Sequence, residues 1–117
     1  MNSITMDTNS DITMLMNKIV EFTTERDWDQ FHNPKDLALA LSIEAAELNE
    51  VFLWKKPEEA NIDKIQEELA DVFTYAFLLA DKCNLDVKEI ILEKQKHNAE
   101  KYPVEKAKGV ATKYTDL

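Results

Sequence analysis

Turn-forming residues and cysteine are both scarce in this chain of 117 residues. One glycine and three prolines leave few positions for the tight turns that join strands, which disfavours a sheet-rich fold. The single cysteine, Cys83, has no partner for an internal disulfide, and its place on a helical apolar face predicts a packed, unreactive thiol. The length suits one domain with a modest core.

The chain also has no excess of positive charge and no long apolar run. Its formal net charge of −9 argues against non-specific binding to nucleic acid or to an anionic membrane. Asp71, Asp81 and Lys82 interrupt the best apolar stretch, so that stretch cannot span a bilayer. The first residues lack the basic and apolar blocks of a secretory signal. We therefore expect a soluble cytoplasmic protein with no nucleic-acid or membrane partner.

Apolar residues recur with a helical period, which predicts an all-α fold, a four-helix bundle-like unit. The predicted helices cover residues 11–26, 34–54, 61–83 and 86–102. Their starts carry residues that cap helices, namely Ser10, Asn33 followed by Pro34, and Asp86 followed by Glu89.

The domain is expected to occupy residues 10–102. Residues 1–9 are polar and expected to fray. Residues 103–117 are expected to form an extended tail that packs on the body or on a neighbouring subunit. The third predicted helix is apolar around most of its circumference, with Phe77 and Leu78 away from its main stripe. Such a helix needs cover from more than one neighbour, so we expect a homo-oligomer.

Acidic residues recur at three-residue spacing on two of the predicted helices, as Glu44 with Glu47 and as Glu68 with Asp71. At about 100° per residue, Glu44 falls inside the apolar sector of its helix and Glu47 lies at the border of that sector. A carboxylate in an apolar sector must be neutral, paired with a base or bound to a cation. We consider this the strongest functional signal in the sequence.

On the third predicted helix, Glu68, Asp71 and Tyr75 form a polar strip at the edge of an apolar face. If the two helices pack together, up to four carboxylates meet in one small volume, where their repulsion requires cations. Oxygen-only ligands favour Mg²⁺, with Mn²⁺ as a substitute, over zinc.

Two chemistries use paired carboxylates on facing helices. Di-iron bundles combine glutamates with Glu-x-x-His motifs, but His97 follows Glu93 by four residues and a second such motif is missing. The other chemistry is metal-assisted hydrolysis of a nucleoside triphosphate. The chain has no glycine-rich phosphate loop, so a nucleotide would be held through metals. Aromatic residues in the loop at 27–32, together with Trp54, offer planar surfaces for a base.

Glu44-x-x-Glu47, a gap of 20 residues, and Glu68-x-x-Asp71 together resemble the signature of the MazG-like all-α nucleoside triphosphate pyrophosphatases. Further segments are similar to the dCTP pyrophosphatase branch of that family. These segments are residues 26–32, 47–55, 67–72, Asn98 with 101–103, and 113–115.

The resemblance implies hydrolysis of a deoxynucleoside triphosphate, dCTP or a related or modified one, to the monophosphate and pyrophosphate. It implies a house-cleaning role in the nucleotide pool and a tetramer built as a dimer of dimers. The implied Mg²⁺ ligands are Glu44, Glu47, Glu68 and Asp71. The implied substrate contacts are Trp28, His32, Trp54, Tyr75, Asn98 and Lys101.

Within this scheme Glu47 is expected to orient or deprotonate the attacking water, with Glu44 as the alternative. Lys55, Lys101 and Lys113 are candidates for neutralising the pyrophosphate. Vertebrate-type members of the family carry a histidine where this chain has Ile19, which leaves the preferred base open. The alternative function is a non-catalytic helical interaction or regulatory protein that keeps the fold.

Overall fold

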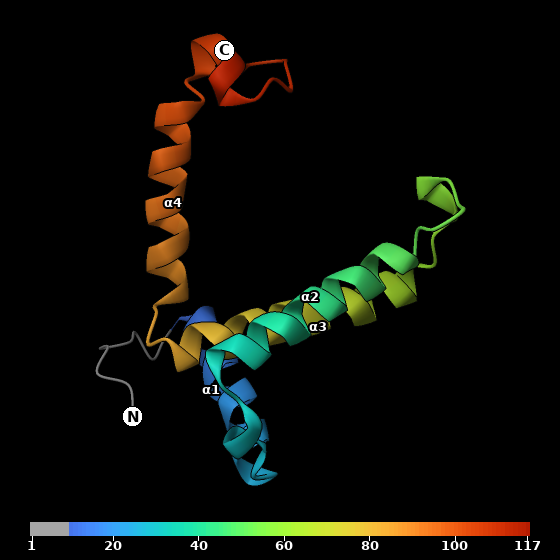
Figure 1. Ribbon diagram of the computed structural model, residues 1–117, viewed down its shortest axis with the longest axis vertical. Helices are drawn as coiled ribbons and strands as arrows, with labels where there is room; N and C mark the ends of the chain where they lie inside the picture. The colour runs from blue at the N-terminus through green and yellow to red at the C-terminus, as the bar shows by residue number, and fades with distance from the viewer. Residues whose placement is uncertain (1–9) are drawn as a thin grey trace. The chain divides into compact units, whose positions relative to one another are not determined.

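The computed structural model describes residues 10–117, and in this part of the chain every regular element is a helix. The all-α prediction is therefore confirmed (Figure 1). None of the described helices is long and apolar enough to cross a membrane. The elements in chain order are α1 Asp11–Glu25, η1 Trp28–Phe31, α2 Pro34–Glu50, η2 Pro57–Glu59, α3 Ile62–Lys82, α4 Val87–Lys101, α5 Val104–Ala107 and η3 Tyr114–Asp116.

The chain divides into two compact units, Met1–Leu85 and Asp86–Leu117. In the first unit α2 and α3 form an antiparallel hairpin whose helices lie side by side, and α1 packs on α3 (Figure 1). The buried apolar side chains of this unit are few, namely Met16, Leu37, Leu78 and Ala80. This small core fixes α1, α2 and α3 relative to one another.

The predicted N-caps are confirmed. The Ser10 hydroxyl accepts from the Thr13 amide at 3.0 Å, and the Asn33 side chain accepts from the Asp36 amide at 3.0 Å. In the second unit Asp86 accepts from the Glu89 amide at 2.9 Å. Each bond satisfies an amide that the helix itself leaves without an acceptor.

The end of α2 was predicted four residues too late. The helix stops at Glu50, and the amides of Phe52 and Leu53 donate to carbonyls three residues back, which tightens the chain out of the α-helix. Trp54 then adopts a left-handed backbone conformation with φ of 64°, which ends any continuation of the helix. Its side chain is 98% exposed.

The tail was predicted to be extended, and this is wrong in part. Within the second unit, α5 begins directly after Pro103, whose missing N–H costs nothing at a helix start. The Tyr102 and Tyr114 rings meet edge to face at 5.9 Å, and the Lys101 ammonium lies 4.8 Å from the Tyr114 ring centre. These contacts fold the tail back on the end of α4.

The expectations for Cys83 and for residues 1–9 have different outcomes. Cys83 is exposed, because it is the C-cap of α3 and lies beyond the last helical turn, so the prediction of a packed thiol is wrong. The expected fraying of residues 1–9 falls outside the described residues.

Large apolar side chains remain uncovered on all three helices of the first unit. Phe73 on α3 is 58% exposed, Leu39 and Ile43 on α2 are 59% and 49% exposed, and Leu15 on α1 is 47% exposed. Some apolar side chains of α3 are buried and others are exposed, as expected for a helix that is apolar around most of its circumference. The homo-oligomer expected from that pattern stays a prediction.

Candidate functional site

The α2–α3 hairpin brings three of the four predicted acidic residues together. One carboxylate oxygen from each of Glu44, Glu68 and Asp71 lies within 4.8 Å of the other two. Glu44 comes from α2, and the other two share one face of α3 because they are three residues apart. Glu44 and Glu68 are half-buried, whereas Asp71 is exposed. Below, this group is called the acidic cluster.

Two oxygens of the acidic cluster lack any hydrogen-bond partner although they are buried, Glu44 Oε2 and Glu68 Oε2. None of the ion pairs found among residues 10–117 involves a member of the cluster or Glu47. A buried carboxylate oxygen without a donor is costly, so this arrangement fits a metal cation as partner better than a lysine or arginine. An all-oxygen set suits Mg²⁺ or Mn²⁺.

The pKa values of the acidic cluster also reflect the cost of holding these negative charges close together and partly buried. Burial raises the pKa of Glu44 to about 7, helped by a hydrogen bond with Glu47 and by the negative charges of Glu47, Asp71 and Glu68. Burial also raises the pKa of Glu68, with the negative charge of Glu47 as the next cause. Glu47 is thus close enough to act on both residues, although it lies outside the group of three.

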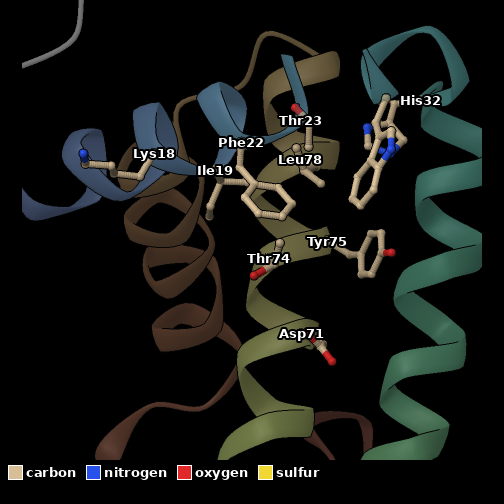
Figure 2. Close-up of a pocket in the computed structure, with 10 residues that line it drawn as sticks. Lys18, Ile19, Phe22, Thr23, His32, Asp71, Thr74, Tyr75 and Leu78 are labelled. Carbon is tan, nitrogen blue, oxygen red and sulfur yellow. The ribbon is translucent and has the colours of Figure 1, made fainter. Parts of the chain in front are cut away.

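A cavity of about 430 Å³ opens beside Asp71, between α1, α3 and the η1 turn. Figure 2 shows Asp71, Tyr75 and Leu78 along α3, with Phe22 reaching toward them from α1. The cavity walls are mainly apolar and aromatic, as in pockets that hold flat organic ligands. The lining residues are Lys18, Ile19, Phe22, Thr23, Trp28, His32, Asp71, Thr74, Tyr75 and Leu78. We call this space the aromatic cavity.

The turn between α1 and α2 delivers two of these aromatic side chains. Asp27 takes a left-handed conformation with φ of 54°, and the Gln30 amide nitrogen donates to the Asp27 carbonyl and carboxylate. Trp28 meets Phe22 edge to face at 5.6 Å. His32 Nδ1 is buried without a partner. Flat rings with an unsatisfied polar atom suit a ligand that is planar and has polar edges.

A second cavity, of about 410 Å³, contacts the acidic cluster from the other direction along α3. It is lined by Glu47, Glu50, Val51, Lys55, Asn61, Lys64 and Glu68, and we call it the lysine cavity. Along α3, Lys64 lies in the lysine cavity, Glu68 and Asp71 in the cluster, and Tyr75 in the aromatic cavity. Because a helix rises about 1.5 Å per residue, Lys64 and Tyr75 are about 16 Å apart along its axis, with the carboxylates between them.

The other predicted site residues are placed as follows. Trp28, His32 and Tyr75 line the aromatic cavity, and Lys55 lines the lysine cavity. Trp54 lines neither cavity. Asn98, Lys101 and Lys113 belong to the second unit, so their part in the site stays a prediction.

Among the α1 residues that line the aromatic cavity, sequence reasoning reached only Ile19, through the family resemblance, and it missed Phe22 and Thr23. Ile19, Phe22 and Thr23 have the i, i+3, i+4 spacing of one helix face, a pattern that by itself would place Phe22 in the core. It is instead 48% exposed, and it borders the cavity. The spacing identifies the face, but only the packing of α1 on α3 shows that this face borders a cavity.

Comparison with known proteins supports this arrangement. The model of the MazG-like family matches residues 39–117, which contain the acidic cluster and Glu47. The chain belongs to the MazG-like family. Its first 38 residues, which carry Trp28 and His32, lie outside the matched region.

Curated relatives and a solved structure extend the comparison. The chain is 43% identical to dCTP pyrophosphatase 1 of Mus musculus over 105 residues and 41% identical to that of Homo sapiens over 105 residues. These matches cover 83% of this chain and 62% of either relative, so the chain spans less than two thirds of their length. A pyrophosphatase from Archaeoglobus fulgidus superposes with a TM-score of 0.76 at 32% identity, covering 86% of this chain and 99% of that one.

Proposed function

We propose that this MazG-like protein is a nucleoside triphosphate pyrophosphatase of the cytoplasm. It hydrolyses deoxynucleoside triphosphates, dCTP or related and modified forms, to the monophosphate and pyrophosphate, and so cleans the nucleotide pool. The observation that carries the proposal is the acidic cluster, whose buried oxygens Glu44 Oε2 and Glu68 Oε2 lack hydrogen-bond partners. The names of the relatives, all pyrophosphatases, support the same reaction.

The residues present fit a divalent cation. Oxygens that share one Mg²⁺ at 2.0–2.1 Å are about 3–4 Å apart, and the three carboxylates already lie within 4.8 Å of one another. Glu44, Glu68 and Asp71 would hold the ion, with Glu47 as the fourth ligand and Mn²⁺ as a substitute for Mg²⁺. When bound, Mg²⁺ neutralises phosphate charge and lowers the pKa of bound water.

The order of features along α3 orients the substrate. The nucleoside occupies the aromatic cavity, where Trp28 and Tyr75 offer flat faces and His32 Nδ1 offers a hydrogen bond. The β- and γ-phosphates extend toward the lysine cavity, where Lys55 and Lys64 receive the leaving pyrophosphate. The α-phosphorus then lies beside the carboxylates, so the α–β bond is the one that breaks.

Glu47 orients or deprotonates the attacking water in this proposal. Its carboxylate is close enough to Glu44 and Glu68 to affect the pKa of both, and it also lines the lysine cavity. A general base at this position contacts both the acidic cluster and the lysine cavity, where the phosphates are proposed to lie. Glu44 remains the alternative general base.

The wall of the aromatic cavity supports a proposal about which nucleobases the protein accepts. Ile19 lines this cavity and offers no hydrogen bond to a base edge. A site that does not hydrogen-bond a distinguishing group rejects analogues weakly. We therefore propose that the protein accepts several bases, not cytosine alone.

We also propose a homotetramer, a dimer of dimers. The exposed apolar side chains Phe73, Leu39 and Ile43 support self-association of the helical unit. Sedimentation at micromolar concentration tests this proposal, and a clean monomer contradicts it.

The reaction is tested with a panel of deoxy- and ribonucleoside triphosphates, including methylated and oxidised forms, assayed for pyrophosphate with Mg²⁺. In ¹⁸O-labelled water, attack at the α-phosphorus places the label in the monophosphate. Orthophosphate release without pyrophosphate contradicts the proposal. The non-catalytic alternative predicts no turnover and no change in thermal midpoint across millimolar Mg²⁺.

A further inference from the structure

The turn between α1 and α2 carries two lining side chains of the aromatic cavity, yet its own bonds are local. The Asp27 amide donates to the Thr24 carbonyl, and the His32 amide donates to the Asp29 carbonyl. The Gln30 side chain reaches back only to Asp27. These bonds fix the shape of the turn, but they do not fix its distance from α3.

A single polar contact joins this turn to α3. The Lys82 ammonium donates to Asp29 Oδ1 and forms an ion pair with it. Within residues 10–117, this is the only side-chain hydrogen bond between residues more than four positions apart. Lys82 is the last residue of α3, and Asp29 directly follows Trp28.

The surroundings of Lys82 make the contact more than a loose surface pair. The Lys82 side chain is 23% exposed and that of Asp29 is 56% exposed. Asp81 is half-buried beside them, and burial raises its pKa while Lys82 lowers it and Asp29 raises it. Asp29 and Asp81 are therefore close enough for their charges to repel each other, and the positive charge of Lys82 offsets this repulsion.

The turn is held from α1 by different contacts. The Arg26 guanidinium lies 3.7 Å from the Phe22 ring centre and donates to the Phe22 carbonyl at 3.0 Å. Phe22 in turn meets Trp28 edge to face. These contacts tie Trp28 to α1, which itself packs on α3. The pair of Lys82 with Asp29 adds a direct polar link between the turn and α3.

We propose that Lys82 is a positioning residue, which through Asp29 holds Trp28 and His32 at the correct distance from α3 for nucleotide binding. This inference rests on the proposed function of the site. Lys82 touches neither cavity and acts through the turn. Its loss should weaken nucleoside binding and leave the chemical step at the acidic cluster unchanged.

The kinetic test compares Lys82→Met, Lys82→Arg and Asp29→Asn with dCTP and Mg²⁺. Lys82→Met should raise KM about two- to five-fold, the range expected for a partly exposed ion pair, with kcat within about two-fold of wild type. Lys82→Arg should restore KM, because arginine can reform the pair. Asp29→Asn should raise KM less than Lys82→Met. The asparagine is neutral, so this variant has no repulsion between position 29 and Asp81 to push the turn away from α3.

The matched control is Lys106→Met, which removes the same charge from an exposed position in the second unit. A KM for Lys82→Met equal to that of Lys106→Met contradicts the proposal. A fall in kcat with an unchanged KM contradicts it as well. Thermal melts of each variant show whether the fold is intact, and Lys82→Arg and Asp29→Asn keep the test valid if Lys82→Met does not fold.

A second readout needs no turnover. In a Trp54→Phe background, Trp28 is the only tryptophan, because the chain has two. Acrylamide should quench its fluorescence more strongly in Lys82→Met than in Lys82→Arg or Lys106→Met. Equal quenching in the three variants overturns the proposal. Stronger quenching in a protein that releases no pyrophosphate supports the positioning role and refutes the proposed function.

Discussion

Replacing Glu44 by glutamine should stabilise the metal-free protein above neutral pH. The substitution keeps the shape of the side chain and removes a charge that burial and Glu47, Asp71 and Glu68 all disfavour. A pKa raised from 4.5 to about 7 corresponds to at most about 3.5 kcal/mol, at about 1.4 kcal/mol per pKa unit. Partial contact of the carboxylate with solvent reduces this to about 1–2 kcal/mol.

The sign follows from proton binding. Between pH 4.5 and about 7 the folded protein holds more protons on Glu44 than the unfolded chain does. The free energy of unfolding of the wild type therefore falls as pH rises through this window. Glu44→Gln has no ionisable group at this position and does not lose stability in this window. The two proteins should be equally stable near pH 4.5, and the variant should be more stable by about 1–2 kcal/mol at pH 8.

Mg²⁺ should reverse the order of stability. Binding to the folded wild type adds about 2.7 kcal/mol when the ion is at a hundred times its Kd, whereas the variant has lost a ligand. Urea unfolding followed by circular dichroism, at pH 4.5 and 8 with EDTA or Mg²⁺ and at one protein concentration, measures all four conditions. Glu21→Gln, on the exposed surface of α1, is the matched control.

Two results would refute this reasoning. A Glu44→Gln variant that is less stable than wild type in EDTA at pH 8 would mean that the buried carboxylate has a favourable partner. An unchanged order of stability on adding Mg²⁺ would mean that Glu44 does not hold the ion. Either result would mean that the acidic cluster is not a metal site that includes Glu44, and the proposed function rests on that cluster.

Three further predictions test separate parts of the site. Glu47→Gln should lower kcat by about 10²–10⁴-fold with an unchanged helical circular dichroism spectrum, and near-normal turnover would remove Glu47 from the mechanism. Trp28→Ala should raise KM for dCTP by about five-fold or more, the loss expected for one stacked base, whereas an unchanged KM would place the base elsewhere. Phe73→Lys should shift the sedimenting species toward monomer, because Phe73 is 58% exposed on α3, and an unchanged distribution would exclude this face from the interface.

Local periodicity was sufficient to predict the four longer helices, α1 to α4, and the acidic face. Residues three apart share a helix face wherever the helix is regular, so Glu68 and Asp71 could be placed together from spacing alone. The end of α2 could not be predicted in the same way. It depends on the backbone of residues 51–55, where Trp54 adopts a positive φ that its residue type does not suggest.

Features that join distant segments could not be predicted from local pattern. The family resemblance grouped Trp28, His32 and Tyr75 as substrate contacts, but the cavity that they line depends on how α1 packs on α3. Lys82 and Asp29 are 53 positions apart, and each looks like an ordinary surface charge in the sequence. Their pairing required the tertiary structure.

The acidic cluster separates the two candidate functions on energetic grounds. Without a cation, Glu44 and Glu68 are held at raised pKa values, each with a buried oxygen that lacks a donor. That arrangement destabilises the fold at neutral pH, and a scaffold would be more stable with glutamine at both positions. A divalent ion turns the same carboxylates into ligands and reverses the sign of their contribution. The cluster therefore favours the proposed metal-binding function over a scaffold. Under that proposal, the two cavities on either side of it would receive the two ends of a nucleotide.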